Sequence, residues 1–145
     1  MKSLILLLLL LPLIFSTVNA EEFKFTINLT CSYANEMKNF TYMIQFLHDD
    51  AFADDDITRI VMNTVYTNQV IVEVNGNLTD DGNRFYEPYG VIWHDCGEDR
   101  KLARLRLHFD QVPVGRQLYI YDLDVDITDN YGVINYYPVS LRHYE

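Results

Sequence analysis

The chain has 145 residues, a formal net charge of −10 and 49% hydrophobic residues, which suits a single domain with a core of its own. The acidic surplus argues against nucleic acid as a partner, because phosphate binding needs a basic surface. It also disfavours simple electrostatic attachment to anionic lipid, although a calcium-bridged contact stays open.

The first twenty residues predict a secretory signal peptide. Lys2 supplies a positive start, an apolar run covers 4–15, and Ala20 ends a small-residue cleavage pattern. The run is too short to span a bilayer and no second run of about twenty apolar residues follows, so no transmembrane segment is predicted. The expected product is a secreted, extracellular domain covering 21–145.

The two cysteines of the domain are Cys31 and Cys96, and in an exported protein they are expected to form one disulfide. Their spacing matches no zinc pattern, so neither a metal nor a cofactor is predicted. Three Asn-x-Thr sequons suit a secreted glycoprotein. Their asparagines are Asn28, Asn39 and Asn77.

Alternation of apolar and polar residues predicts short β-strands along the whole domain. In 23–31 the alternation is unbroken, and it directs Cys31 into the core and Asn28 outward. Similar alternation occurs at 40–48, 69–74, 101–109 and 118–127. With turn-like segments between them, seven or eight strands and no long helix are expected. This pattern predicts an all-β fold, an antiparallel β-sandwich.

One segment, "EPYGVIWHDC" at 87–96, resembles a segment of the nematode transthyretin-like family that reads approximately P-Y-x-x-I-x-H-x-C. The stretches "FTINLTC", "IQFLHDDAFADDDI", "RLRLHFDQVP" and "YDLDVDIT" line up with that family in the same order, so the resemblance covers nearly the whole domain. It implies a secreted transthyretin-like antiparallel β-sandwich of two sheets, in a family whose activity is unsettled.

His94 and Asp95 can be interpreted in two ways. They could form a general base with its orienting carboxylate, or they could reflect ordinary strand alternation beside a disulfide. Neighbours on a strand point to opposite faces, so Asp95 is not expected to orient His94. No nucleophile motif accompanies them, and no catalytic residue is predicted.

A basic face is the candidate ligand-binding site, formed by Arg104, Arg106 and His108 on one parity of a strand. A hairpin at "DQVPVGR" would set this face opposite a second set of side chains as a charge ladder. That set is Asp122, Asp124 and Asp126. The transthyretin-like resemblance implies instead that the two strands lie in different sheets. A free arginine pair could then hold a carboxylate or a phosphate head group.

An acidic loop spans 49–56 and holds five aspartates. Clustered carboxylates are ligands that calcium prefers, but the spacing does not match an EF-hand. The loop is interpreted as solvated surface.

These observations predict a secreted, non-enzymatic transthyretin-like binding protein. It would act outside the cell on a lipid, a small ligand or a cell-surface protein. The alternative is a small secreted hydrolase that uses His94 or His108 with Arg104 or Arg106. That alternative predicts that those residues converge in one concave pocket with room for a substrate.

Overall fold

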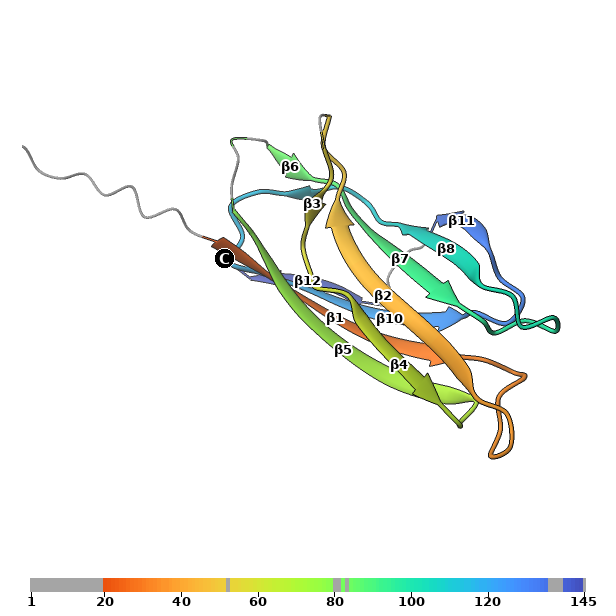
Figure 1. Cartoon of the computed structure of the whole chain (residues 1–145). Helices are drawn as coiled ribbons and strands as arrows, with labels where there is room; N and C mark the ends of the chain where they lie inside the picture. The colour runs from red at the N-terminus through yellow and green to blue at the C-terminus, as the bar shows by residue number, and fades with distance from the viewer. Residues whose placement is uncertain (1–19, 52, 80–81, 83, 136–139, 145) are drawn as a thin grey trace, which may run out of the picture.

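The computed structural model describes residues 20–51, 53–79, 82, 84–135 and 140–144 (Figure 1). The described residues form twelve strands and no helix. In chain order these are β1 (Ala20–Thr30), β2 (Phe40–His48), β3 (Asp55–Asp56), β4 (Val61–Val65), β5 (Gln69–Thr79), β6 (Phe85–Tyr86), β7 (Pro88–His94), β8 (Ala103–His108), β9 (Val112–Pro113), β10 (Leu118–Asp126), β11 (Gly132–Asn135) and β12 (Ser140–Tyr144). Accordingly, this part of the chain holds no helix with the length and apolarity needed to cross a membrane.

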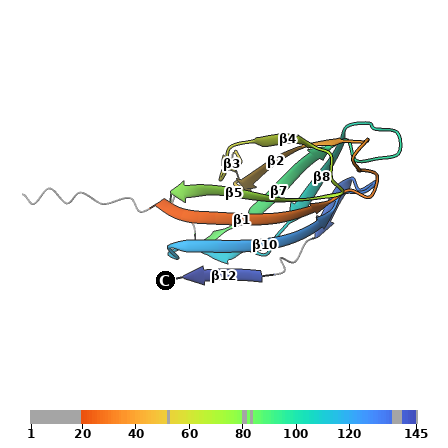
Figure 2. The ribbon, with the colours of Figure 1, turned by 90° about the horizontal axis from the view of Figure 1, so that it is seen from below.

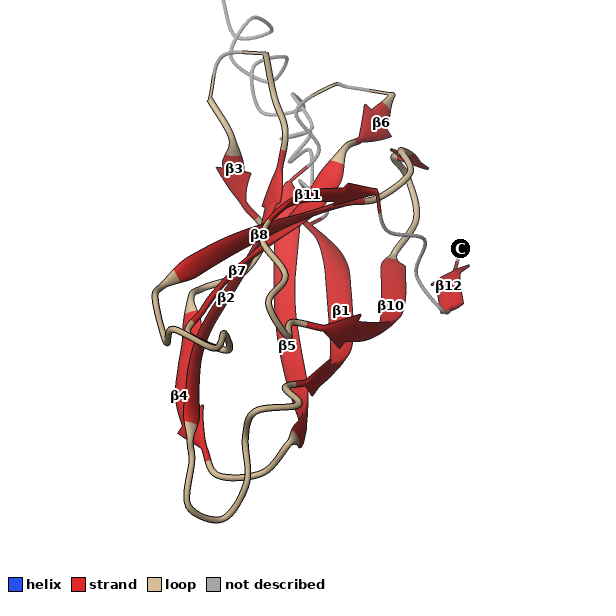
Figure 3. Ribbon diagram, turned by 90° about the vertical axis from the view of Figure 1, so that its right-hand side faces the viewer, coloured by secondary structure: helices blue, strands red, loops and turns tan. Residues whose placement is uncertain are grey.

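Two sheets pack face to face, which confirms the predicted β-sandwich (Figures 2 and 3). The first sheet has the strand order β12, β10, β1, β5. The second has the order β11, β8, β7, β2, with β3 and β4 both pairing along the remaining edge of β2. Two of the strand pairs, β1 with β10 and β8 with β11, are parallel, a detail that the alternation pattern could not reveal.

The core lies between the sheets and is rich in aromatic rings. The inward-facing apolar residues of β1 are each at most 1% exposed; they are Phe23, Phe25, Ile27 and Leu29. Phe25 stacks on Phe46 of β2 with ring centroids 3.7 Å apart, and on Tyr121 of β10 at 4.9 Å. Burying each such ring contributes about 1.5–3 kcal/mol, and the Phe25–Phe46 contact joins the two sheets directly.

The predicted disulfide is present between Cys31 and Cys96. It joins the end of β1, in the first sheet, to the segment that follows β7, in the second. A disulfide of this kind is compatible with an extracellular protein. The predicted signal peptide itself lies outside the described residues, apart from Ala20, the first residue of β1.

The charge ladder considered between the basic face, on β8, and the aspartates of β10 is not formed, because these strands lie in different sheets. The segment 109–117 crosses from one sheet to the other instead of making a hairpin, and on the way it forms β9, which pairs with β6. Asp122, Asp124 and Asp126 therefore lie on the outer face of the first sheet, and the basic face lies on the second sheet. This is the placement that the family resemblance implies.

Candidate functional site

The outer face of the second sheet carries a group of large side chains that we call the arginine face. Strand register places Met62 of β4 beside Met43 of β2, Met43 beside Trp93 of β7, and Trp93 beside Arg104 of β8. A second row continues across β7 and β8 toward the other end of the strands. The arginine face consists of Met43, Met62, Tyr89, Trp93, Arg104, Arg106 and His108.

Arg104 is exposed and its guanidinium lies 5.9 Å from the centre of the Trp93 ring. The face of an indole attracts a cation, so this contact holds the guanidinium against the sheet. Among the described residues Arg104 makes no ion pair. Its charge is therefore open to a partner.

Arg106 is more tightly held than Arg104. Its guanidinium lies 3.8 Å from the centre of the Tyr89 ring, and its Nη2 donates to Asp49 Oδ2 at 2.9 Å. The Tyr89 hydroxyl in turn donates to Asp54 Oδ2 at 2.5 Å, and burial raises the pKa of Tyr89 to about 12. The ring of His108, also partly buried, is 6.5 Å from that of Tyr89. Arg106 is thus part of a fixed network, while Arg104 is the accessible cation.

The aspartates of the acidic loop contact different partners and do not converge on one point. Asp49 pairs with Arg106, Asp54 accepts from Tyr89, and Asp56 Oδ1 accepts from Gln45 Nε2 at 2.7 Å. Within the described part of the chain, no three His, Cys, Asp or Glu side chains are placed to hold a metal ion.

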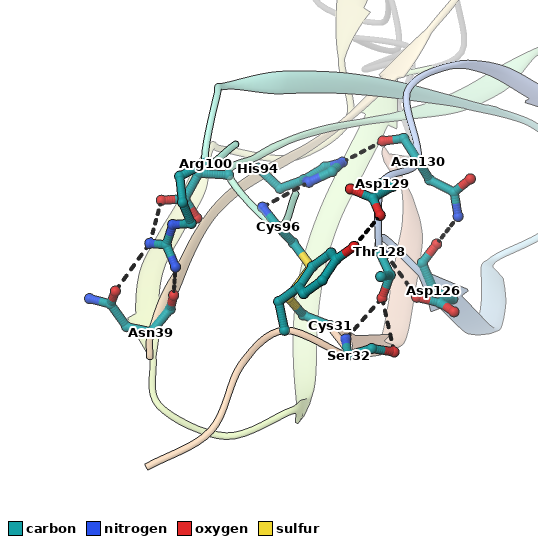
Figure 4. The surroundings of a disulfide bond; sticks show 12 residues. Cys31, Ser32, Asn39, His94, Cys96, Arg100, Asp126, Thr128, Asp129 and Asn130 are labelled. Carbon is teal, nitrogen blue, oxygen red and sulfur yellow. Dashed lines mark hydrogen bonds and ion pairs between the residues drawn. A yellow bond between two sulfur atoms is a disulfide. The ribbon is translucent and has the colours of Figure 1, made fainter. Parts of the chain in front are cut away.

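His94 is buried, and its ring lies beside Cys96 of the disulfide (Figure 4). Its Nδ1 accepts the Cys96 N–H at 3.3 Å, so Nε2 carries the proton and donates to the Asn130 carbonyl at 2.7 Å. Burial lowers the pKa of His94, which keeps the ring neutral. Both ring nitrogens are occupied, and the geometry gives His94 a structural role.

Asp95 makes its contacts away from His94. Its Oδ1 accepts the Thr41 N–H at 2.7 Å, and its Oδ2 pairs with Arg100 at 3.0 Å. Arg100 also donates to the Asn39 side chain at 3.1 Å (Figure 4). Asp95 therefore ties the loop after β7 to the start of β2.

The residues of the hydrolase alternative converge only in part, since His94 and Arg104 line one cavity at the disulfide end. His94 lies opposite Ala103 at one end of the β7–β8 pair, whereas His108 lies opposite Tyr89 at the other end. His94 is on the inner side and His108 on the outer side. Arg106 and His108 are not on the lining of that cavity, so the hydrolase alternative retains only the pair of His94 and Arg104 and stays a prediction.

A cavity of about 850 Å³ opens at the disulfide end, between the loop after β7 and the loop before β11. Leu102 and Tyr131, on its lining, are 69% and 77% exposed. Arg104 borders both this cavity and the arginine face, so the two surfaces adjoin.

The three predicted sequons differ in accessibility. Asn28, on the central strand β1, donates to Asp124 Oδ1 at 2.8 Å and accepts from Gln69 at 2.7 Å. Asn39 is partly buried and holds Arg100. Asn77 is exposed on β5 and is the sequon that the folded domain presents most freely.

The stacking partners of the two arginines were missed in the sequence. Tyr89, Val91 and Trp93 share one parity in "YGVIW", a signal that could have placed them on the outer face beside the basic strand. No protein-family model matches the chain, and no curated protein or solved structure matches it significantly. Membership of the transthyretin-like family therefore stays a prediction.

Proposed function

We propose that this protein is a secreted, non-enzymatic binding protein that contacts an extracellular partner through the arginine face. The observation that carries the proposal is the row Met62, Met43, Trp93 and Arg104, which crosses four neighbouring strands and has an exposed residue at each end, Met62 and Arg104. Aromatic residues, methionine and arginine are the residue types enriched at protein–protein contacts.

The chemistry of the face favours a protein partner with an acidic group over a bare anionic membrane. Arg104 offers one open guanidinium beside apolar side chains, a pattern suited to a carboxylate next to an apolar contact. The acidic loop at the far end of the face, and the net charge of −10, oppose broad attachment to anionic lipid.

The test uses labelled protein secreted from eukaryotic cells and measures its binding to cell surfaces. Arg104→Glu is expected to weaken binding about tenfold or more, because it reverses the open charge. Lys24→Glu makes the same charge change on the outer face of the first sheet and is the matched control. Equal loss in both variants, or no binding to cells, would contradict the proposal.

A parallel measurement is co-sedimentation with neutral and anionic vesicles, with calcium and with a chelator. The proposal expects no vesicle binding in any of these conditions. Binding that requires calcium would assign the function to the acidic loop, and calcium-independent binding to anionic vesicles that Arg104→Glu abolishes would identify a lipid head group as the ligand.

A further inference from the structure

The outer edge of β5 lies in the first sheet, apart from the arginine face on the second sheet. β5 lies at the border of the first sheet and pairs with β1 (Figures 1 and 2). It runs for 11 residues, longer than most edge strands, and it contains no proline. Natural sheets usually block such an edge, because its free N–H and C=O groups can template another strand.

One end of this edge is closed by the chain itself. The Asn77 N–H donates to the Ile57 carbonyl at 3.1 Å, so the backbone of Asn77 points away from β1. Gly76 permits this approach, because a Cβ atom there would lie 1.8 Å from the Ile57 oxygen. The edge of β5 is thus covered by Ile57 at residues 76–77 and is open at residues 71–75.

The open part has a defined set of hydrogen-bonding groups. Because backbone direction alternates along a strand, Ile71, Glu73 and Asn75 share the outward direction of Asn77. Among the described residues, none of these three has a backbone partner on its outer side. They offer three donors and three acceptors in a row, enough to order one added strand.

The surroundings select the kind of strand that fits. On the inner side, Val61 and Val65 of β4 and Val70 of β5 are only partly buried against the core, so the open border has room for apolar side chains. On the outer side, the exposed Glu73 is the one charged residue of β5, and Asp122 lies two strands away at the same level. An acidic outer side attracts basic side chains.

We propose that β5 residues 71–75 bind an extended segment of a partner protein, whose side chains alternate between apolar and basic, as an added antiparallel strand of the first sheet. A second copy of this chain is a poorer occupant, since it would bring its own Glu73 and a net charge of −10 to the same border.

The test measures binding of a short synthetic peptide that alternates lysine and valine, with blocked ends, by calorimetry. Glu73→Pro removes the outward N–H while leaving the pairing with β1 in place, and is expected to weaken binding about tenfold. Glu73→Gln keeps the N–H and removes only the charge, and is expected to weaken binding about threefold. Arg104→Glu is expected to leave peptide binding unchanged, which separates this edge from the arginine face.

Three outcomes would overturn the proposal: unchanged binding by Glu73→Pro, equal binding of a peptide that alternates glutamate and valine, or self-association that Glu73→Pro abolishes without any peptide binding. The last would assign the edge to a second copy. Thermal unfolding of each variant confirms folding, and Ile71→Pro tests the same edge if Glu73→Pro does not fold.

Discussion

The two outer faces of the sandwich are built by the same alternation but differ in character. On the first sheet, the outward positions in the second half of β10 are Asp122, Asp124 and Asp126, after Leu118 and Ile120 in the first half. Asn28 and Gln69 extend the polar surface beside the aspartates. On the second sheet the outward positions hold the arginine face, with rings and methionines between the charges. Alternation therefore identifies outward residues, but only the neighbours supplied by other strands decide whether a face is solvated or suited to contact.

The largest expected effect comes from removing the disulfide that joins the two sheets. Replacing Cys31 and Cys96 together with alanine is expected to cost about 4 kcal/mol of unfolding free energy, because the bridge closes a loop with a sequence separation of 65. Urea titration of the variant and the oxidised parent measures the difference. A loss below about 1 kcal/mol would show that the aromatic core alone holds the sheets together.

The next test disrupts the contact between Ile57 and the edge of β5. Gly76→Ala places a methyl group against the Ile57 backbone and is expected to cost about 1–3 kcal/mol. Gly82→Ala, where a Cβ atom would meet nothing within 4 Å, is the comparison for a glycine with open space, although its φ of 92° adds strain of its own. A loss below about 0.5 kcal/mol in Gly76→Ala would mean that the close approach of Ile57 does not constrain this position.

The polar face can be tested through its sequons. Asn28→Ala removes hydrogen bonds to Asp124 and Gln69 and is expected to cost about 1–2 kcal/mol. Asn77→Ala, at an exposed position, is expected to change stability by less than about 0.5 kcal/mol. Chemical denaturation of unglycosylated protein measures both, and a reversed order would contradict the accessibility argument.

Within the arginine face, the two arginines are expected to separate. Arg106→Ala loses the contact with Tyr89 and the pair with Asp49, at a cost of about 1 kcal/mol after allowance for solvent screening. Arg104→Ala is expected to cost less than about 0.5 kcal/mol while still weakening partner binding. Thermal unfolding distinguishes them, and equal costs would remove the distinction between a structural and an available arginine.

The smallest expected effect is a pH dependence of stability that comes from the buried His94. The pKa of His94 is lowered from 6.5 by burial, so the neutral ring stabilises the fold above that pH. This contribution is lost as the pH falls through the pKa of the folded state. Urea titrations across the acidic range should show a loss that His94→Gln reduces and His108→Gln, on the outer face, does not.

Much of the fold could be predicted because it depends on local pattern. Burial in β1, β2 and β10 follows the predicted parity, and Cys31 meets Cys96 as expected. The short strands β3, β6 and β9 could not be predicted, since two residues carry no periodicity. The parallel pairing of β1 and β10 also leaves no local signal.

The candidate site was predicted in part for the same reason. Parity placed Arg104, Arg106 and His108 together, but it could not choose between aspartates of β10 and rings of β7 as their neighbours. That choice depends on which sheet each strand joins. The ion pair between Arg106 and Asp49 joins residues far apart in the sequence and was equally invisible to local pattern.

The parallel pair of β1 and β10 also sets an order of events during synthesis. Asn28 and Asp124 are 96 positions apart, so β1 can acquire this neighbour only after most of the chain has left the ribosome. Closure of the first sheet is therefore a late, non-local step, of the kind that slows folding. An enzyme that modifies the growing chain would meet Asn28 before Asp124 has been made. The Asn28 side chain would then be accessible, whereas in the folded domain it is hydrogen-bonded to Asp124.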